Sequence, residues 1–175
     1  PINVNVALLK LKDLILNRNP KAEVETMERD FLTMSFEEQE EALRGSDLVI
    51  ATSDSNAVQF VVNDICHFLR IPSIYVGCYE RACAGEVIFV IPGQTPCFNC
   101  FMEFRKDTLG NIQVKDKKMP YSNEAPSGLK AEPGLAIDIN YVTITASAYA
   151  LALLDSHSDR NRLLDRERNL ILVHS

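Results

Sequence analysis

The feature that most constrains the fold is a run of strand, helix and strand in the middle of the chain. The apolar stretch DLVIA at 47–51 has the length and composition of a strand that is buried on both faces. TSDSN follows with residues that favour a helix start, and IPSIYVGC at 71–78 reads as the next strand. Between them, apolar residues recur at helical spacing: Val58, Val61, Val62, Ile65 and Leu69. Strand, helix and strand with short connections are typical of a βαβ unit, so the sequence predicts an α/β, Rossmann-like fold with a mostly parallel sheet flanked by helices.

The rest of the chain adds elements of both kinds. The patterns predict helices over about 5–18, over 35–45 with Ser35 as its cap, and over about 135–155, and strands in AEVETMERD (22–30), GEVIFVIPG (85–93) and RNLILVH (168–174). The helix at 135–155 is apolar around most of its circumference, which predicts that it is buried or lies at an interface. Residues 103–133 lack periodicity and predict a long crossover loop.

Composition narrows the class of protein. With 175 residues, 46% of them apolar, the chain predicts a single domain over residues 1–175. The 24 acidic against 18 basic residues, and the lack of a long basic run, argue against nucleic acid as a partner. Without a signal peptide or a ~20-residue apolar stretch, we expect a cytoplasmic protein with no membrane partner. Residue 1 is Pro, so we expect an excised piece of a longer chain.

The segment GQTPCFNC carries two cysteines three positions apart, Cys97 and Cys100. Such a pair can be half of a zinc site, which takes four thiolate or imidazole ligands. It can also be a redox pair at a helix start, or it can be incidental. Cys78 and Cys83 are the candidates for completing a zinc site within the chain.

Asp54 is the second candidate site residue. It follows a predicted parallel strand and precedes a helix, which is where doubly wound sheets bind ligands, although the residues alone favour an N-cap over a ligand-binding residue. In the helix itself, Asn63 can face a ligand or the core, and Cys66 is expected to be a small buried residue. No G-x-G-x-x-G motif occurs, so the usual loop that cradles nucleotide phosphates is missing from the sequence.

Three blocks together resemble the ThiF/MoeB/HesA family of ubiquitin-activating-enzyme-like adenylyltransferases. They are SDLVIATSDSNAVQFVVNDICHFLRIPSIYVG, GEVIFVIPGQTPCFNC and EPGLAIDINYVTITASAYALALL. The first is similar to that family's strand and T-D-N-type turn, and the second to its P-G-x-T-P-C-x-x-C segment. The resemblance extends from about residue 5 to residue 155.

The resemblance implies an ATP-dependent adenylyltransferase that activates the C-terminal carboxylate of a ubiquitin-like or sulfur-carrier protein. It implies ATP, Mg²⁺ and Zn²⁺ as cofactors and a homo- or heterodimer as the assembly. By position, Asp54 matches the metal-proximal catalytic aspartate of the family, and Cys97 and Cys100 match its first zinc pair. Asp54 and Asn63, with Lys10, are then the expected nucleotide-binding residues.

Departures from the family pattern leave an alternative open. The Gly-rich nucleotide loop and the second C-x-x-C are missing, which predicts an incomplete, C-terminal portion of a ThiF-type domain. The expected Lys of the first helix falls at about Ala7, with Lys10 one turn later, and the expected Arg after the turn is Gln59. The alternative is therefore a catalytically inactive, ThiF-like interaction or dimerisation module, which can use the apolar helix at 135–155 as a dimer surface.

Overall fold

The computed structural model describes residues 4–53, 55–79, 84–109, 136–155, 157 and 159–174. The chain divides into two compact units, Pro1–Gln39 and Glu40–Ser175. The single domain expected over the whole chain stays a prediction.

The first unit contains helix α1 (Val4–Arg18) and the short 3-10 helix η1 (Phe31–Thr33), and it leads into α2 (Phe36–Leu43). α1 ends just before Asn19 and Pro20, as predicted. Ser35 caps α2: the Glu38 N–H donates to Ser35 Oγ at 3.3 Å, and the Ser35 N–H donates to the Glu38 carboxylate at 2.9 Å. This reciprocal pair is a capping box, and the bonds that Glu38 accepts hold the pKa of its carboxyl below the usual value.

The strand predicted at 22–30 is wrong, because these residues form no strand. A strand is stable only when a neighbour supplies hydrogen-bond partners. The described part of the first unit contains no other strand, so the alternation of apolar and charged residues has no sheet to join.

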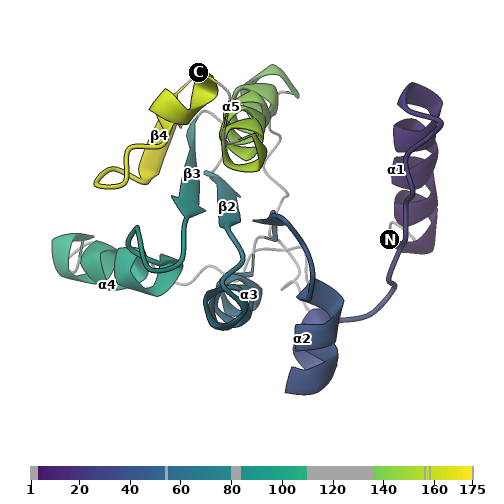
Figure 1. Cartoon of the computed structure of the whole chain (residues 1–175), viewed down its shortest axis with the longest axis horizontal. Coiled ribbons are helices and arrows are strands. Elements are labelled where there is room, and N and C mark those ends of the chain that lie inside the picture. Colours follow the sequence, from purple (N-terminus) through teal and green to yellow (C-terminus); the bar gives the residue numbers. More distant parts are fainter. Residues whose placement is uncertain are drawn as a thin grey trace, which may run out of the picture. The chain divides into compact units, whose positions relative to one another are not determined.

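The second unit holds a four-stranded sheet, labelled in Figure 1 apart from its edge strand β1. Its strands lie in the order β1 (Val49–Ala51), β2 (Ser73–Cys78), β3 (Ala84–Val90) and β4 (Leu170–His174). β1 pairs with β2 in parallel, but β2 pairs with β3, and β3 with β4, antiparallel. The α/β class is confirmed, whereas the mostly parallel sheet is wrong for the described strands. The reason is the connection from β2 to β3, which has only five residues, 79–83, and is too short for a crossover helix.

β1 also departs from the expectation of burial on both faces. Ala51 is buried, but Ile50 is 47% exposed. β1 is an edge strand of the described sheet, and Ile50 points to the opposite face of the strand from the buried Ala51.

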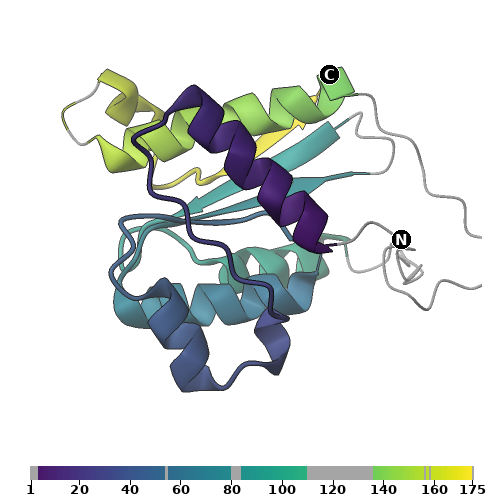
Figure 2. The ribbon, with the colours of Figure 1, turned by 90° about the vertical axis from the view of Figure 1, so that its right-hand side faces the viewer.

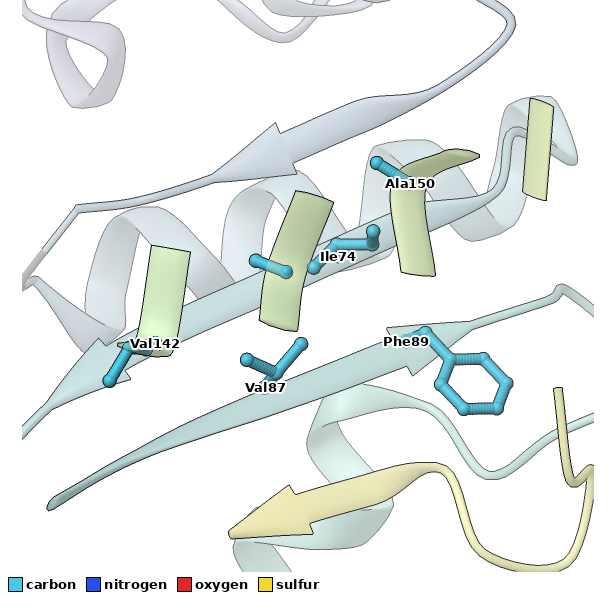
Figure 3. Packing of buried hydrophobic residues seen from close by; sticks show 6 residues of the cluster. Ile74, Val87, Phe89, Val142 and Ala150 are labelled. Atoms are coloured by element: carbon cyan, nitrogen blue, oxygen red, sulfur yellow. The ribbon is translucent and has the colours of Figure 1, made fainter. Parts of the chain in front are cut away.

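Helices cover both faces of the sheet, as Figure 2 shows. α3 (Asn56–Leu69) and α4 (Phe98–Leu109) lie on one side, and α5 (Ala136–Leu154) lies on the other. The core under α5 joins Ile74 of β2 and Val87 and Phe89 of β3 to small residues of α5 (Figure 3). By length and composition α5 would also pass for a membrane span, and its Val142, Ala146 and Ala150 side chains pack in the core against the sheet.

The predicted crossover loop at 103–133 begins later than expected. α4 continues to Leu109, so residues 103–109 are helical, and the remainder of that prediction lies outside the described residues. Phe98, Phe101 and Phe104 recur at three-residue spacing, a helical pattern that extends into the segment predicted as a loop.

Candidate functional site

The connection between β1 and α3 is the centre of the candidate site. It lies at the carboxyl end of a parallel strand pair, where α/β proteins bind ligands. Asp54 itself lies outside the described residues. On either side of it, the Ser55 N–H donates to Ser53 Oγ at 3.1 Å, and Gln59 Nε2 donates to the Ser53 carbonyl oxygen at 2.7 Å. Since the Gln59 side chain is buried, α3 fixes the backbone immediately before Asp54.

Asn63 lies one turn further along α3 and is 3% exposed. Its Oδ1 accepts a hydrogen bond at 3.0 Å from the N–H of Phe98, the first residue of α4. The first N–H groups of a helix have no partner within the helix, so this bond satisfies one of them and fixes the start of α4. Asn63 is also predicted to bind a nucleotide. In the structure its side-chain oxygen accepts a hydrogen bond from the first residue of α4 instead, and the nucleotide-binding role stays a prediction.

The phenyl ring of Phe98 anchors the same helix end to the sheet. It stacks on Tyr75 of β2 with ring centroids 4.7 Å apart and meets Phe60 of α3 edge-on at 5.4 Å. Phe98 is 2% exposed. The start of α4 is thus held by a backbone hydrogen bond and by aromatic packing at once.

Cys97 and Cys100 are positioned by this anchored helix start. Their Sγ atoms lie 3.4 Å apart, with Cys97 partly buried and Cys100 exposed. Partial burial alone would raise the pKa of the Cys97 thiol. Hydrogen bonds from Cys100, from the backbone of Asn99 and from the Asn63 side chain outweigh that effect and bring the pKa below the usual value.

The thiol pair fits half of a zinc site. Two thiolates at ~2.3 Å from a tetrahedral zinc lie about 3.8 Å apart, close to the separation found here. Among the described residues, however, no group of three or more Cys, His, Asp or Glu side chains can hold a metal ion. Cys78 is exposed at the end of β2, and Cys83 lies outside the described residues. The described residues therefore offer at most two of the four ligands that a structural zinc site takes.

Asn169 is a supporting residue that the sequence did not reveal. Its Nδ2 donates both to the Phe89 carbonyl oxygen at 2.7 Å and to the Pro96 carbonyl oxygen at 2.8 Å. These two hydrogen bonds link the residue just before β4 to the end of β3 and to the residue before Cys97. An Asn ahead of an apolar run is a common pattern, so nothing in the sequence distinguished it.

A second unforeseen cluster joins β3 to the body of α4. The Tyr79 hydroxyl donates to Glu86 Oε2 at 2.6 Å, and Arg105 lies 3.5 Å from Glu86 Oε1 and 5.9 Å from the centre of the Tyr79 ring. Burial and the Glu86 carboxylate raise the pKa of Tyr79 to about 12, so the hydroxyl stays a donor. The cluster fixes the orientation of α4.

The remaining predicted residues have simpler surroundings. Lys10 is an exposed residue of α1 in the first unit. Cys66 is 1% exposed, and burial raises the pKa of its thiol to about 12, which confirms the expectation of a small buried residue.

Comparison with known proteins shows to which family this chain belongs. The sequence model of the ThiF family matches residues 9–169. The chain belongs to the ThiF family. It is 30% identical over 90 residues to ubiquitin-like modifier-activating enzyme 5 of Arabidopsis thaliana, and 32% identical over 60 residues to the SAMP-activating enzyme E1 of Haloferax volcanii. These stretches cover 51% and 34% of this chain.

Solved structures give the same fold for this ThiF-family chain. Escherichia coli MccB with ATP matches 94% of the chain with a TM-score of 0.60 at 18% sequence identity. PaaA matches 95% of it with a TM-score of 0.57 at 14% identity. The chain spans 21% of each of the two curated relatives and 43% of that MccB chain.

Proposed function

We propose that this ThiF-family chain is part of an ATP-dependent adenylyltransferase that activates the C-terminal carboxylate of a ubiquitin-like or sulfur-carrier protein. The observation that carries the proposal is the family match over residues 9–169, which includes both the β1–α3 connection and the Cys pair. Relatives named as modifier-activating and SAMP-activating enzymes support the substrate class. MccB was solved with ATP, which supports the cosubstrate.

In this reaction the carrier's carboxylate attacks the α-phosphate of ATP and pyrophosphate leaves. Bound Mg²⁺ would offset the negative charge that develops on the phosphates, and Asp54 is the residue proposed to hold it. The described residues would keep that position in place: the Gln59 amide holds the Ser53 carbonyl oxygen, and Ser53 Oγ holds the Ser55 N–H. A connection fixed in advance loses little conformational entropy when it binds a ligand. Asn63 and Lys10 are proposed as further nucleotide-binding residues.

We also propose that zinc binds Cys97 and Cys100, that the protein works as a dimer, and that it is cytoplasmic. The 3.4 Å separation of the two Sγ atoms supports the metal. In this role zinc would stabilise the start of α4 through the two cysteines, in addition to the hydrogen bond to Asn63 and the aromatic packing of Phe98.

The test is MgATP binding measured by calorimetry. It compares this chain with a version extended by the residues that its gene encodes upstream, each with and without Asp54→Ala. Asp47→Ala is the matched control, because Asp47 is an exposed carboxylate at the amino end of the same strand. Binding by the extended chain that Asp54→Ala weakens at least tenfold, and Asp47→Ala leaves unchanged, is the expected result. An equal effect of both substitutions would remove Asp54 from the mechanism.

A second candidate function rests on Gln59. At this position the resemblance to the family calls for an Arg, whereas Gln59 is buried and its amide is bonded to the Ser53 carbonyl oxygen. A neutral side chain that is already bonded to the backbone supplies no positive charge to phosphates, which favours a catalytically inactive interaction module. Absence of MgATP binding by both the chain and its extended version supports this second function and contradicts the first.

A further inference from the structure

The thiols of Cys97 and Cys100 lie almost in contact at the start of α4. Their Sγ atoms are 3.4 Å apart, and a disulfide bond is about 2.05 Å long, so an approach of ~1.4 Å would join them. The Phe101 N–H donates to the Cys97 carbonyl oxygen at 3.1 Å, which makes Cys97 part of the first helical turn. Residues three apart across a helical turn have Cα atoms about 5 Å apart, which is within the range that a disulfide bridges.

Both peptide groups that flank Cys97 are held by side chains from distant parts of the chain. The Pro96 carbonyl oxygen accepts a hydrogen bond from Asn169 Nδ2 at 2.8 Å. On the other side, the Phe98 N–H donates to Asn63 Oδ1 at 3.0 Å. Both asparagines are buried, so these bonds are shielded from water. The backbone that carries Cys97 is therefore preorganised, and the two thiols stay together without a further loss of conformational entropy.

The two thiols differ in their access to solvent. Cys100 is exposed, whereas Cys97 is partly buried. In thiol–disulfide exchange an accessible thiol reacts with a disulfide from solution, and a second thiol beside it then displaces the group that was added. The pair has one thiol suited to each step. Within the described part of the chain, no set of metal ligands larger than the pair itself competes with bond formation between the two sulfur atoms.

We propose that Cys97 and Cys100 are a redox-active pair that closes reversibly to a disulfide. The inference goes beyond the adenylation proposed above and does not depend on it. It bears on the proposed zinc, because the metal binds thiolates and a disulfide offers none. The pair therefore has two exclusive states, an open dithiol that can bind the metal and a closed disulfide that cannot.

The exchange proceeds in two balanced steps with a small disulfide, such as oxidised glutathione, as the oxidant. The Cys100 thiolate attacks one sulfur atom of the oxidant, whose S–S bond breaks, and one glutathione leaves as a thiolate. The Cys97 thiolate then attacks the Cys100 sulfur atom of the mixed disulfide, which forms the Cys97–Cys100 bond and releases the second glutathione. In all, the pair loses two electrons and two protons, and the oxidant takes them up as two glutathione thiols. Excess reduced glutathione reverses both steps.

The test is redox equilibration of the full chain after a chelator has removed bound metal. The protein is incubated in mixtures of reduced and oxidised glutathione, quenched with acid and alkylated, and its free thiols are counted by mass spectrometry. The chain has five cysteines, and the expected result is the loss of two thiols, with the disulfide mapped by peptide analysis to Cys97 and Cys100. The ratio of closed to open pairs should vary with the inverse square of the reduced glutathione concentration. A pair that stays reduced in oxidised glutathione alone, or a disulfide that maps only to other cysteines, overturns the inference.

Serine variants separate the pair from the other cysteines. Cys97→Ser should leave Cys100 as a mixed disulfide with one glutathione, because no second thiol displaces it. Cys78→Ser is the matched control at another exposed cysteine, and it should leave the loss of two thiols unchanged. Circular dichroism of each variant verifies that it is folded. Loss of the two-thiol transition in Cys78→Ser overturns the inference.

A final arm adds zinc before the oxidant. Zinc that binds the pair should slow the formation of the disulfide at least tenfold, because zinc-bound thiolates react slowly. An unchanged rate contradicts the proposed zinc site and supports the disulfide as the state that the pair adopts. None of these measurements involves ATP, so their outcome is separate from the test of adenylation.

Discussion

The backbone N–H of Phe98 donates to Oδ1 of Asn63 at 3.0 Å, across 35 positions of sequence. This bond connects the helix that follows β1 to the helix that presents the Cys pair. The two parts of the candidate site are thereby coupled through one buried amide.

Asn63→Ala should destabilise the second unit by about 1–3 kcal/mol, because it leaves the buried N–H of Phe98 without an acceptor. The measurement is urea unfolding followed by circular dichroism. Asn99→Ala is the control: its amide bonds to the exposed Asp64 carboxylate at 3.0 Å, so its loss should cost less than ~1 kcal/mol. Equal losses from both variants would mean that Asn63 does not anchor α4.

Gly85→Ala should cost about 1–3 kcal/mol, because α5 crosses β3 at this glycine. A Cβ there would lie 2.6 Å from Val142 Cγ2 and 2.7 Å from the Gly77 carbonyl oxygen. Gly77→Ala is the matched control on β2, since its Cβ would meet only the flexible Glu86 side chain, at 3.3 Å. Thermal unfolding of both variants gives the comparison, and a Gly85→Ala chain as stable as the control would contradict this packing.

Removal of zinc should expose two thiols. If Cys97 and Cys100 bind the metal, titration with a thiol reagent should detect about two more reactive cysteines after a chelator is added, because zinc-bound thiolates react slowly. Cys97→Ser or Cys100→Ser should abolish this increase, whereas Cys78→Ser, at an exposed cysteine outside the pair, should preserve it. A chelator-independent count would exclude the metal and leave the pair as free thiols.

Stability should fall at alkaline pH in part because of Cys66. Burial raises the pKa of this thiol from 9.0 to about 12, so the folded chain keeps a proton that the unfolded chain loses. The stabilisation is fully present below pH 9 and is lost as the pH rises towards 12. Urea unfolding at pH 8 and pH 10 should therefore show a smaller decrease for Cys66→Ala than for the wild type. Identical decreases would assign the effect to other groups, of which buried Tyr75, with its raised pKa, is the foremost.

Local patterns predicted the helices well. α1 ends where Pro20 requires it to end, and Ser35 and Glu38 start α2, because these signals act within a few residues. The orientation of β3 was missed because the pattern of a buried strand is the same in parallel and antiparallel sheets. Only the short connection after Cys78 carried the distinction.

The roles of the candidate site residues stay predictions. The Cys pair and its helix follow from sequence spacing, and the family resemblance identified the turn that carries Asp54. The contacts of Gln59 and Asn169 could not be predicted, because each depends on which backbone oxygen the fold brings near. For Asn169 the two oxygens lie 80 and 73 positions away.

The pairing of β3 with β4 has a consequence for the order of folding. β2 and β3 form a hairpin across five residues, so they can pair on the microsecond timescale of local contacts. β4 meets β3 only after the intervening 79 residues, including α4 and α5, have been brought into place, and closing so long a loop is entropically costly. β4, the last strand along the chain, is then also the last to join the sheet. The hydrogen bond from Asn169 to the Pro96 carbonyl oxygen, just before Cys97, forms only in that final step.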